Sequence, residues 1–261
     1  MRTTTGVVFR PQAPPEQLRE VVEAADAAEA VDELWLWEDC FLEGGLTAAA
    51  AALAWSSRVR VGIGLLPVPL RNPALVAMEV ATLARLFPDR FVLGLGHGVL
   101  DWMEQVGVRA PSPMTLLREH TSAVAALLAG ERVTVSGTYV QLDAVALDWP
   151  PARPPRLLVG ARGPRTVALA GELTDGVLLD AVAGPDEVAR ARATAQEARR
   201  LAGREGEVHV ATYTEIGAAD VTPDAVAARV SLLAAAGADT VVLQSDGDDP
   251  DPLRLVSALA G

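Results

Sequence analysis

The chain alternates short apolar runs with longer stretches in which apolar and polar residues mix at helical spacing. The apolar runs are nearly continuous and rich in valine and leucine, which is typical of parallel strands that are covered on both faces. The pattern predicts strands at Thr5–Phe9, Leu34–Trp37, Val59–Ile63, Phe91–Leu95, Arg156–Val159, Gly176–Leu179, Val208–Thr214 and Thr240–Leu243.

Each predicted strand is followed by a predicted helix. Several of these helices begin with proline at or near the first turn, where its missing N–H is not needed. Others are expected to end at a glycine, namely Gly130, Gly171, Gly203 and Gly237. The predicted helices are Pro15–Ala30, Leu46–Ser56, Pro73–Phe87, Thr115–Ala129, Pro164–Ala170, Pro185–Ala202, Pro223–Ala236 and Asp251–Ala260.

This alternation in a chain of 261 residues predicts an α/β fold, a single (β/α)8 TIM barrel domain over residues 1–261. A doubly wound open sheet is the alternative, although that fold usually needs fewer strands. The alternation breaks once, between strands 4 and 5, where Glu131–Pro155 forms a short insertion. Within it, Val133–Val135 and Tyr139–Leu142 can pair as a hairpin. We expect the insertion to pack at or near the mouth of the barrel.

Composition narrows the possible partners. The net charge is −12 and all 22 basic residues are arginines, so nucleic acid is not an expected partner. No apolar run approaches the ~20 residues of a membrane span, and residues 1–9 lack the apolar core of a secretion signal. Cys40 is the single cysteine, which excludes an internal disulfide. We therefore expect a cytoplasmic protein that binds a small-molecule substrate and no membrane.

Functional residues of a barrel lie just after its strands, because the βα loops gather at one end. After the fourth predicted strand, Gly96 and Gly98 flank His97, the residue of that turn with acid–base chemistry. The competing interpretation is a tight strand-to-helix turn with an exposed histidine. Downstream, Glu104 is either catalytic or part of a solvated helix start.

Two further turns carry candidate chemistry. After the second predicted strand, Asp39 can accept a hydrogen bond from a ligand, whereas Cys40 is either a nucleophile or a buried structural residue. After the third, Gly64-Leu65 lies in a proline-rich loop that is either a specific ligand support or a plain rigid connector.

The turn after the fifth predicted strand has the features of an anion site. Its glycines expose backbone N–H groups at the start of a helix and its arginines add charge, so a phosphate is the natural ligand. The residues are Gly160, Ala161, Arg162, Gly163, Pro164 and Arg165. A metal site is not expected, because His120 and His209 lack partners at ligand spacing.

Four blocks of the chain together resemble the luciferase-like monooxygenase superfamily, the bacterial-luciferase-type flavin and deazaflavin oxidoreductases. Their order and spacing carry the resemblance, which runs from Gly6 to about Leu243. The blocks are Leu34-Trp-Leu-Trp-Glu-Asp-Cys-Phe41, Gly62-x-Gly…Pro69-x-Arg-Asn-Pro73, Asp89-Arg-Phe-x-Leu-Gly-Leu-Gly-His-Gly98 and Gly160-Ala-Arg-Gly-Pro164.

The resemblance implies a homodimeric barrel that binds a flavin-type ring at the C-terminal ends of the strands. In the deazaflavin-dependent branch it implies a cis peptide at Gly64-Leu65. Cys40 departs from the histidine that the family carries at that position. The candidate catalytic residues are His97, Asp39 and Glu104, and the candidate cofactor-binding residues are Asp39, Gly64, Leu65, Gly96, His97, Gly160, Ala161, Arg162, Gly163, Pro164 and Arg165.

The leading hypothesis is an oxidoreductase that transfers hydride between coenzyme F420 and a small organic substrate. The first alternative is an FMN-dependent monooxygenase of the same fold. A flavin-binding barrel without turnover and a sugar-phosphate or isomerase barrel without flavin are the others; the last would use the Gly160 turn for a substrate phosphate.

Overall fold

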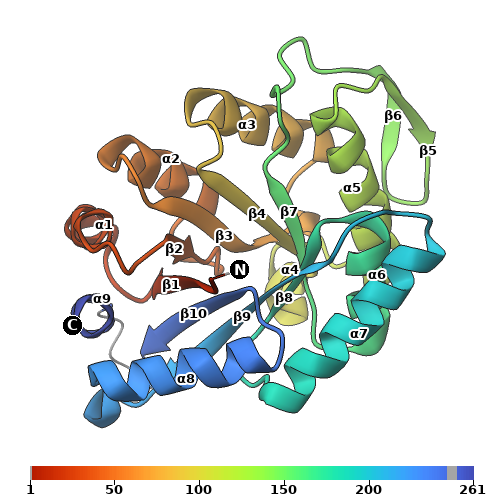
Figure 1. Ribbon diagram of the computed structural model, residues 1–261. Coiled ribbons are helices and arrows are strands. Elements are labelled where there is room, and N and C mark those ends of the chain that lie inside the picture. Colours follow the sequence, from red (N-terminus) through yellow and green to blue (C-terminus); the bar gives the residue numbers. More distant parts are fainter. Residues whose placement is uncertain (1, 246–251) are drawn as a thin grey trace.

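A closed parallel barrel forms from the predicted apolar runs. The computed structural model describes residues 2–245 and 252–261. The barrel has the strand order β1-β10-β9-β8-β7-β4-β3-β2, so the predicted (β/α)8 architecture is confirmed and the open-sheet alternative is wrong (Figure 1). Its strands are β1 (Thr4–Phe9), β2 (Glu33–Leu36), β3 (Arg60–Pro67), β4 (Phe91–Gly96), β7 (Arg156–Gly160), β8 (Gly176–Leu179), β9 (His209–Ile216) and β10 (Thr240–Ser245).

An outer ring of helices covers the barrel (Figure 1). The helices are α1 (Leu18–Ala27), α2 (Gly45–Trp55), α3 (Pro73–Leu86), α4 (Leu100–Gln105), α5 (Pro113–Leu128), α6 (Pro164–Leu173), α7 (Pro185–Leu201), α8 (Pro223–Ala235) and α9 (Leu253–Ala260). The short α4 adds to the predicted set, and the predicted start of the last helix at Asp251 lies outside the described residues. None of the helices in the described ranges combines the length and apolar character needed to cross a bilayer.

The insertion between β4 and β7 forms the predicted hairpin, but its second strand begins later than expected. β5 (Val133–Ser136) pairs antiparallel with β6 (Gln141–Val145). Tyr139 and Val140 lie in the turn instead of in the strand, because their N–H groups donate to the carboxylate of Glu119 at 2.8 and 3.0 Å.

The hairpin lies mainly outside the barrel. Its apolar face packs on α3 and α5. Figure 1 shows the hairpin beside α5, outside the ring of strands. Only the turn reaches the rim, where the Tyr139 hydroxyl accepts a hydrogen bond from the N–H of Ser112 at 2.8 Å. The expected packing at the mouth is therefore correct for the turn and wrong for the strands.

One predicted helix end is also wrong. Gly171 lies inside α6, where an added Cβ would be 1.9 Å from the carbonyl oxygen of Ala195 in α7. This glycine allows two helices to approach closely and does not end one. By contrast, Gly130, Gly203 and Gly237 follow α5, α7 and α8 with positive φ, as helix-ending glycines do.

Two aromatic side chains fill the inside of the barrel beside β3. Trp35 of β2 and Tyr213 of β9 belong to a buried interior cluster, and their rings meet edge to face with centroids 5.9 Å apart. β3 leaves room for them because its inward residues are glycines. A Cβ on Gly62 would lie 2.6 Å from the Trp35 ring, and one on Gly64 would lie 2.0 Å from the Tyr213 hydroxyl. The interior is therefore filled with side chains below the mouth.

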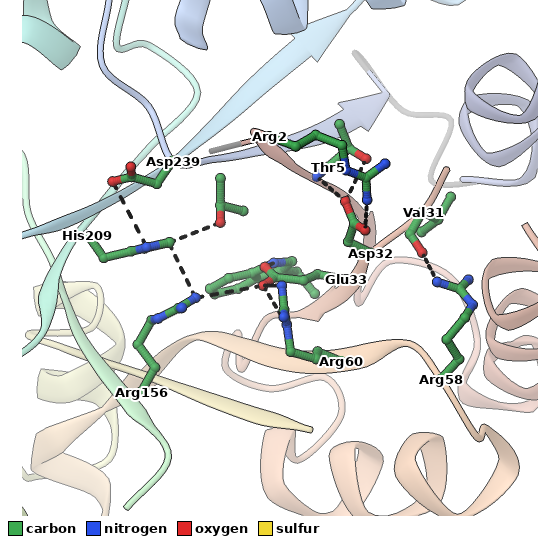
Figure 2. Close-up of polar contacts among 12 residues, drawn as sticks. Arg2, Thr5, Val31, Asp32, Glu33, Arg58, Arg60, Arg156, His209 and Asp239 are labelled. Carbon is green, nitrogen blue, oxygen red and sulfur yellow. Dashed lines mark hydrogen bonds and ion pairs between the residues drawn. The ribbon is translucent and has the colours of Figure 1, made fainter. Parts of the chain in front are cut away.

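Charged side chains close the N-terminal end of the barrel (Figure 2). Glu33 is 1% exposed and accepts hydrogen bonds from Trp35 Nε1 at 2.9 Å and from Arg60 Nη2 at 2.8 Å. Beside it, His209 Nε2 lies 3.0 Å from Thr240 Oγ1, and burial lowers the pKa of His209 to about 4. The C-terminal ends of the strands, where the active sites of barrel enzymes lie, are at the opposite end.

Candidate active site

A bulge of β3 forms the floor of the barrel mouth. The pairing of β3 with β4 shifts register between Ile63 and Leu66, which turns Leu65 over the barrel. A Cβ on Gly96 or on Gly160 would lie 2.4 Å from Leu65 Cδ2, so the Leu65 side chain occupies the space that these glycines leave. The result is an apolar side chain resting on two glycine backbones. The Gly64–Leu65 peptide bond is cis, as the resemblance implied.

Asp39 and Arg10 lie near each other at the ends of β2 and β1, and Glu43 follows in the same loop between β2 and α2. Burial raises the pKa of Asp39, and the nearby charge of Arg10 acts in the opposite direction. Burial also raises the pKa of Glu43 to about 7, and no described residue donates a hydrogen bond to its buried Oε1. Glu43 can therefore hold a proton near neutral pH, and Asp39 keeps one to higher pH than an exposed aspartate.

Other polar groups at the strand ends are held by partners. At the ends of β7 and β8, Arg162 forms an ion pair with Asp180. At the ends of β10 and β9, Gln244 Nε2 donates to Glu215 Oε1 at 2.9 Å. These pairs fix polar side chains around the rim of the mouth.

The start of α6 beside β7 is open. Gly163 is the N-cap of α6, and a Cβ placed on it would meet no atom within 4 Å. Arg165, in the first turn, is exposed and forms no ion pair within residues 2–245 and 252–261. An open helix N-terminus with an unpaired arginine is suited to an anion.

Cys40 is not activated as a nucleophile. It is half-buried, and burial together with the charges of Glu38 and Asp39 raises the pKa of its thiol. The nearby cation, Arg71, is held by Glu38, with Nη2 and Oε2 2.8 Å apart. The thiol form therefore dominates at neutral pH, which favours the structural interpretation of this cysteine.

His97 lies on the outer side of β4. Val92 faces the barrel interior, so alternation along the strand also turns Gly94 and Gly96 inward and turns His97 toward the helices. Burial lowers the pKa of His97, and the backbone of Pro113 acts in the opposite direction. Its Nδ1 is buried without a hydrogen-bond partner among the described residues. A cavity of about 10 Å³ beside it is lined by Val68, Pro69, Leu100, Met103, Arg109, Ala110, Pro113 and Leu116.

The predicted site residues thus fall into three groups. Gly64, Leu65, Gly96 and Gly160 form one floor, with Asp39 and residues 161–165 around it at the strand ends. His97 points away from this floor. Glu104 lies exposed on α4, where it accepts a hydrogen bond from Arg109 Nη1 at 2.5 Å.

Some residues of the mouth were missed by sequence reasoning. Arg10 directly follows β1 and Gln244 lies near the end of β10, so their positions after apolar runs could have indicated them. Tyr213 lies inside a strand, and only the register across the barrel reveals that it reaches Gly64. Within the described residues, no group of three or more histidine, cysteine or acidic side chains could hold a metal ion.

The chain is similar in sequence and in fold to known proteins. Over 253 residues the chain is 27% identical to 5,10-methylenetetrahydromethanopterin reductase of Methanolobus tindarius, which covers 95% of this chain and 76% of that relative. The fold of this chain is similar to that of the coenzyme F420-dependent tetrahydromethanopterin reductase from Methanopyrus kandleri, with a TM-score of 0.85 and 19% sequence identity. The match covers 100% of this chain and 98% of that reductase chain. The fold is also similar to that of the oxygenating constituent of 3,6-diketocamphane monooxygenase from Pseudomonas putida in complex with FMN, with a TM-score of 0.80 and 17% sequence identity. That match covers 100% of this chain and 96% of the monooxygenase chain.

The family assignment rests on the sequence itself. Residues 2–237 match the family described as luciferase-like monooxygenase, which is most of the chain and includes the floor, the Asp39 wall and the start of α6. The chain belongs to the luciferase-like monooxygenase family.

Proposed function

We propose that this protein is a flavin-type oxidoreductase that transfers hydride between coenzyme F420 and a small organic substrate. The observation that carries the proposal is the floor of the mouth, where Leu65 lies across the backbones of Gly96 and Gly160. A flat ring system needs a flat apolar support against one face while the other face stays open to substrate. A relative named as F420-dependent glucose-6-phosphate dehydrogenase and a structure named as coenzyme F420-dependent tetrahydromethanopterin reductase support F420 as the ring.

The cofactor phosphate would bind at the start of α6. The space around Gly163 and the dipole of the helix both favour an anion there. Arg165 would supply the charge, because Arg162 is already held by Asp180. Ala161 and Pro164 would shape the backbone of this turn.

F420, when bound, supplies the carbon that accepts or donates the hydride, and the protein supplies orientation and proton handling. Oxidation of an alcohol releases a proton along with the hydride, and reduction of a carbonyl takes one up. We assign this proton to Asp39, which lies at the wall of the mouth with a raised pKa. Glu43, with its pKa near 7 and an unpaired buried oxygen, is a second group able to relay it.

The placement of His97 supports a role in shaping the site over a role in proton transfer. Its side chain faces α5, and a turn toward the floor would need a new rotamer. Glu104 is exposed and held by Arg109, which supports a structural role for it on α4.

An FMN-dependent monooxygenase is the second candidate, because a solved structure of this fold contains FMN. Reduced FMN reacts with oxygen whereas reduced F420 does not, so oxygen uptake separates the two. The purified protein is mixed with each reduced ring in air, and oxygen is followed with an electrode. Our proposal predicts no oxygen uptake by the protein with reduced F420. With reduced FMN, it predicts no more oxygen uptake in the presence of the protein than reduced FMN shows alone. Protein-dependent uptake with FMN, coupled to oxygenation of a substrate, would favour the second candidate.

We propose that the protein acts in the cytoplasm, as a homodimer, on a small molecule and without a nucleic-acid or membrane partner. The net charge of −12 supports the exclusion of nucleic acid.

A further inference from the structure

We propose that Tyr213 is a positioning residue for the cofactor ring: its hydroxyl holds the carbonyl of Gly64 and so sets the height of the Leu65 floor. The inference rests on the proposed function, since the floor matters only if a ring lies on it. Tyr213 lies inside β9 and not in a loop of the mouth.

The contact crosses the barrel. Tyr213 comes from β9 and Gly64 from β3, and the Tyr213 hydroxyl donates to the Gly64 carbonyl oxygen at 2.9 Å. A Cβ on Gly64 would lie 2.0 Å from that hydroxyl, so the ring end is seated directly against this backbone. Leu65 follows at once, and its side chain lies on Gly96 and Gly160. A change in the height of the Gly64 carbonyl therefore moves the floor.

The Tyr213 ring is itself held in place. Its centroid lies 5.9 Å from that of Trp35 and 5.6 Å from that of Trp37, both in edge-to-face geometry. Trp35 is in turn anchored at the closed end of the barrel, where its Nε1 donates to Glu33 Oε2 at 2.9 Å. The bulge is thus supported by Tyr213, Trp35 and Glu33, whose side chains contact one another in turn from the mouth to the closed end of the barrel.

The chemistry of the hydroxyl suits a fixed donor. Tyr213 is 5% exposed, and burial raises the pKa of its phenol, so it stays protonated across the working pH range. A protonated phenol beside a carbonyl donates one hydrogen bond and transfers no proton. Its loss would leave the Gly64 carbonyl without this donor in an apolar surrounding.

The test compares Tyr213→Phe with Tyr139→Phe, because the chain has 2 tyrosines and both form one hydrogen bond to the backbone. Phenylalanine keeps the ring and its packing. Binding of F420 is measured by fluorescence quenching, and the absorption spectrum of the bound ring is recorded. We expect Tyr213→Phe to weaken binding by roughly 5- to 20-fold and to alter the bound spectrum. Tyr139→Phe should bind like the wild type.

The outcomes separate the two proposals. If Tyr213→Phe lowers the melting temperature but binds F420 with wild-type affinity and spectrum, Tyr213 is merely structural and the inference is overturned. If the wild type itself binds neither F420 nor FMN, the proposed function fails and this inference fails with it.

A second measurement covers the case in which Tyr213→Phe does not fold. In the Tyr139→Phe background, incorporated 3-fluorotyrosine labels Tyr213 alone. We expect its ¹⁹F resonance to shift as F420 saturates the site, because the ring presses on the backbone that this hydroxyl holds. A resonance that is unchanged at saturation overturns the inference.

Discussion

At the residue scale, the two arginines before and within α6 differ in what they contact. Arg162 is held by Asp180, whereas Arg165 forms no ion pair within the described ranges. Of these two arginines, Arg165 is therefore the one whose charge is not neutralised by an ion pair and can interact with a phosphate. The difference could not be predicted from the sequence, in which both arginines flank the same glycine turn.

Replacement of Arg165 by alanine should weaken cofactor binding by about 10- to 100-fold, which corresponds to ~1–3 kcal/mol for a charge-assisted hydrogen bond. Fluorescence titration measures it, with Arg190→Ala as the control, since Arg190 is exposed on α7 and pairs with Glu187. An unchanged affinity in a folded Arg165→Ala protein would exclude a phosphate contact for this residue.

His120 shows how a buried residue makes stability depend on pH. It is 1% exposed, its Nε2 lies 3.1 Å from the carbonyl oxygen of Arg71, and burial lowers its pKa to about 4. The unfolded chain binds a proton near pH 6.5 and the folded protein only near pH 4. Stability is therefore complete above pH 6.5 and is lost as the pH falls toward 4.

Between pH 6.5 and 4, His120 and His209 should each lower the wild-type free energy of unfolding by about 1.4 kcal/mol per pH unit, whereas Glu43, whose pKa is raised to about 7, acts with the opposite sign. Urea titrations at several pH values measure the slope. The pKa of His209 is also lowered, so His209 makes stability fall with pH in the same direction. His120→Gln should therefore reduce the slope of unfolding free energy against pH, and the contribution of His209 should remain. A slope identical in the variant and the wild type would refute the assignment to His120.

At the element scale, Gly171 decides how α6 and α7 pack. A Cβ there would lie 1.9 Å from a backbone carbonyl oxygen of α7, which cannot move aside as a flexible side chain can. Gly171→Ala should destabilise the protein by roughly 2 kcal/mol or more, with a lower melting temperature. Gly44→Ala is the matched control, because its nearest atom would be 3.7 Å away. Equal melting temperatures for both variants would contradict this account.

The strands were predictable because each is buried on both faces, which leaves a continuous apolar run such as Phe91–Leu95. The floor was predictable only in part. Glycines 64, 96 and 160 indicated a site without side chains, but the sequence does not say that Leu65 fills their space. That fact depends on the register shift between Ile63 and Leu66 and on which strands are neighbours.

His97 shows the same limit for the candidate site. Its place after a buried strand indicated the mouth, where acid–base chemistry is expected. The direction of its side chain follows instead from the alternation along β4, which continues one residue past the strand and turns the imidazole toward α5. The position of a residue along the chain predicts at which end of the barrel it lies, whereas the register of the strand decides whether its side chain points inward or outward.

At the scale of the whole molecule, α2 and α3 offer a face for a second copy of the chain. α2 is apolar around most of its circumference, and α3 exposes Leu75, Met78 and Leu86 on one side. We predict a homodimer that buries this face. Sedimentation equilibrium should give twice the mass of 27.3 kDa, and Met78→Glu should shift it toward the monomer. A monomeric wild type at micromolar concentration would contradict the prediction.

The central claim is that the barrel mouth binds a deazaflavin ring on the Leu65 floor. The most direct test is a titration of the purified protein with F420 and, separately, with FMN, followed by fluorescence quenching. We predict saturable binding of F420 at a ratio of one per chain and weaker binding of FMN. The claim would be contradicted if the protein, shown by circular dichroism to be folded, quenched the fluorescence of neither F420 nor FMN.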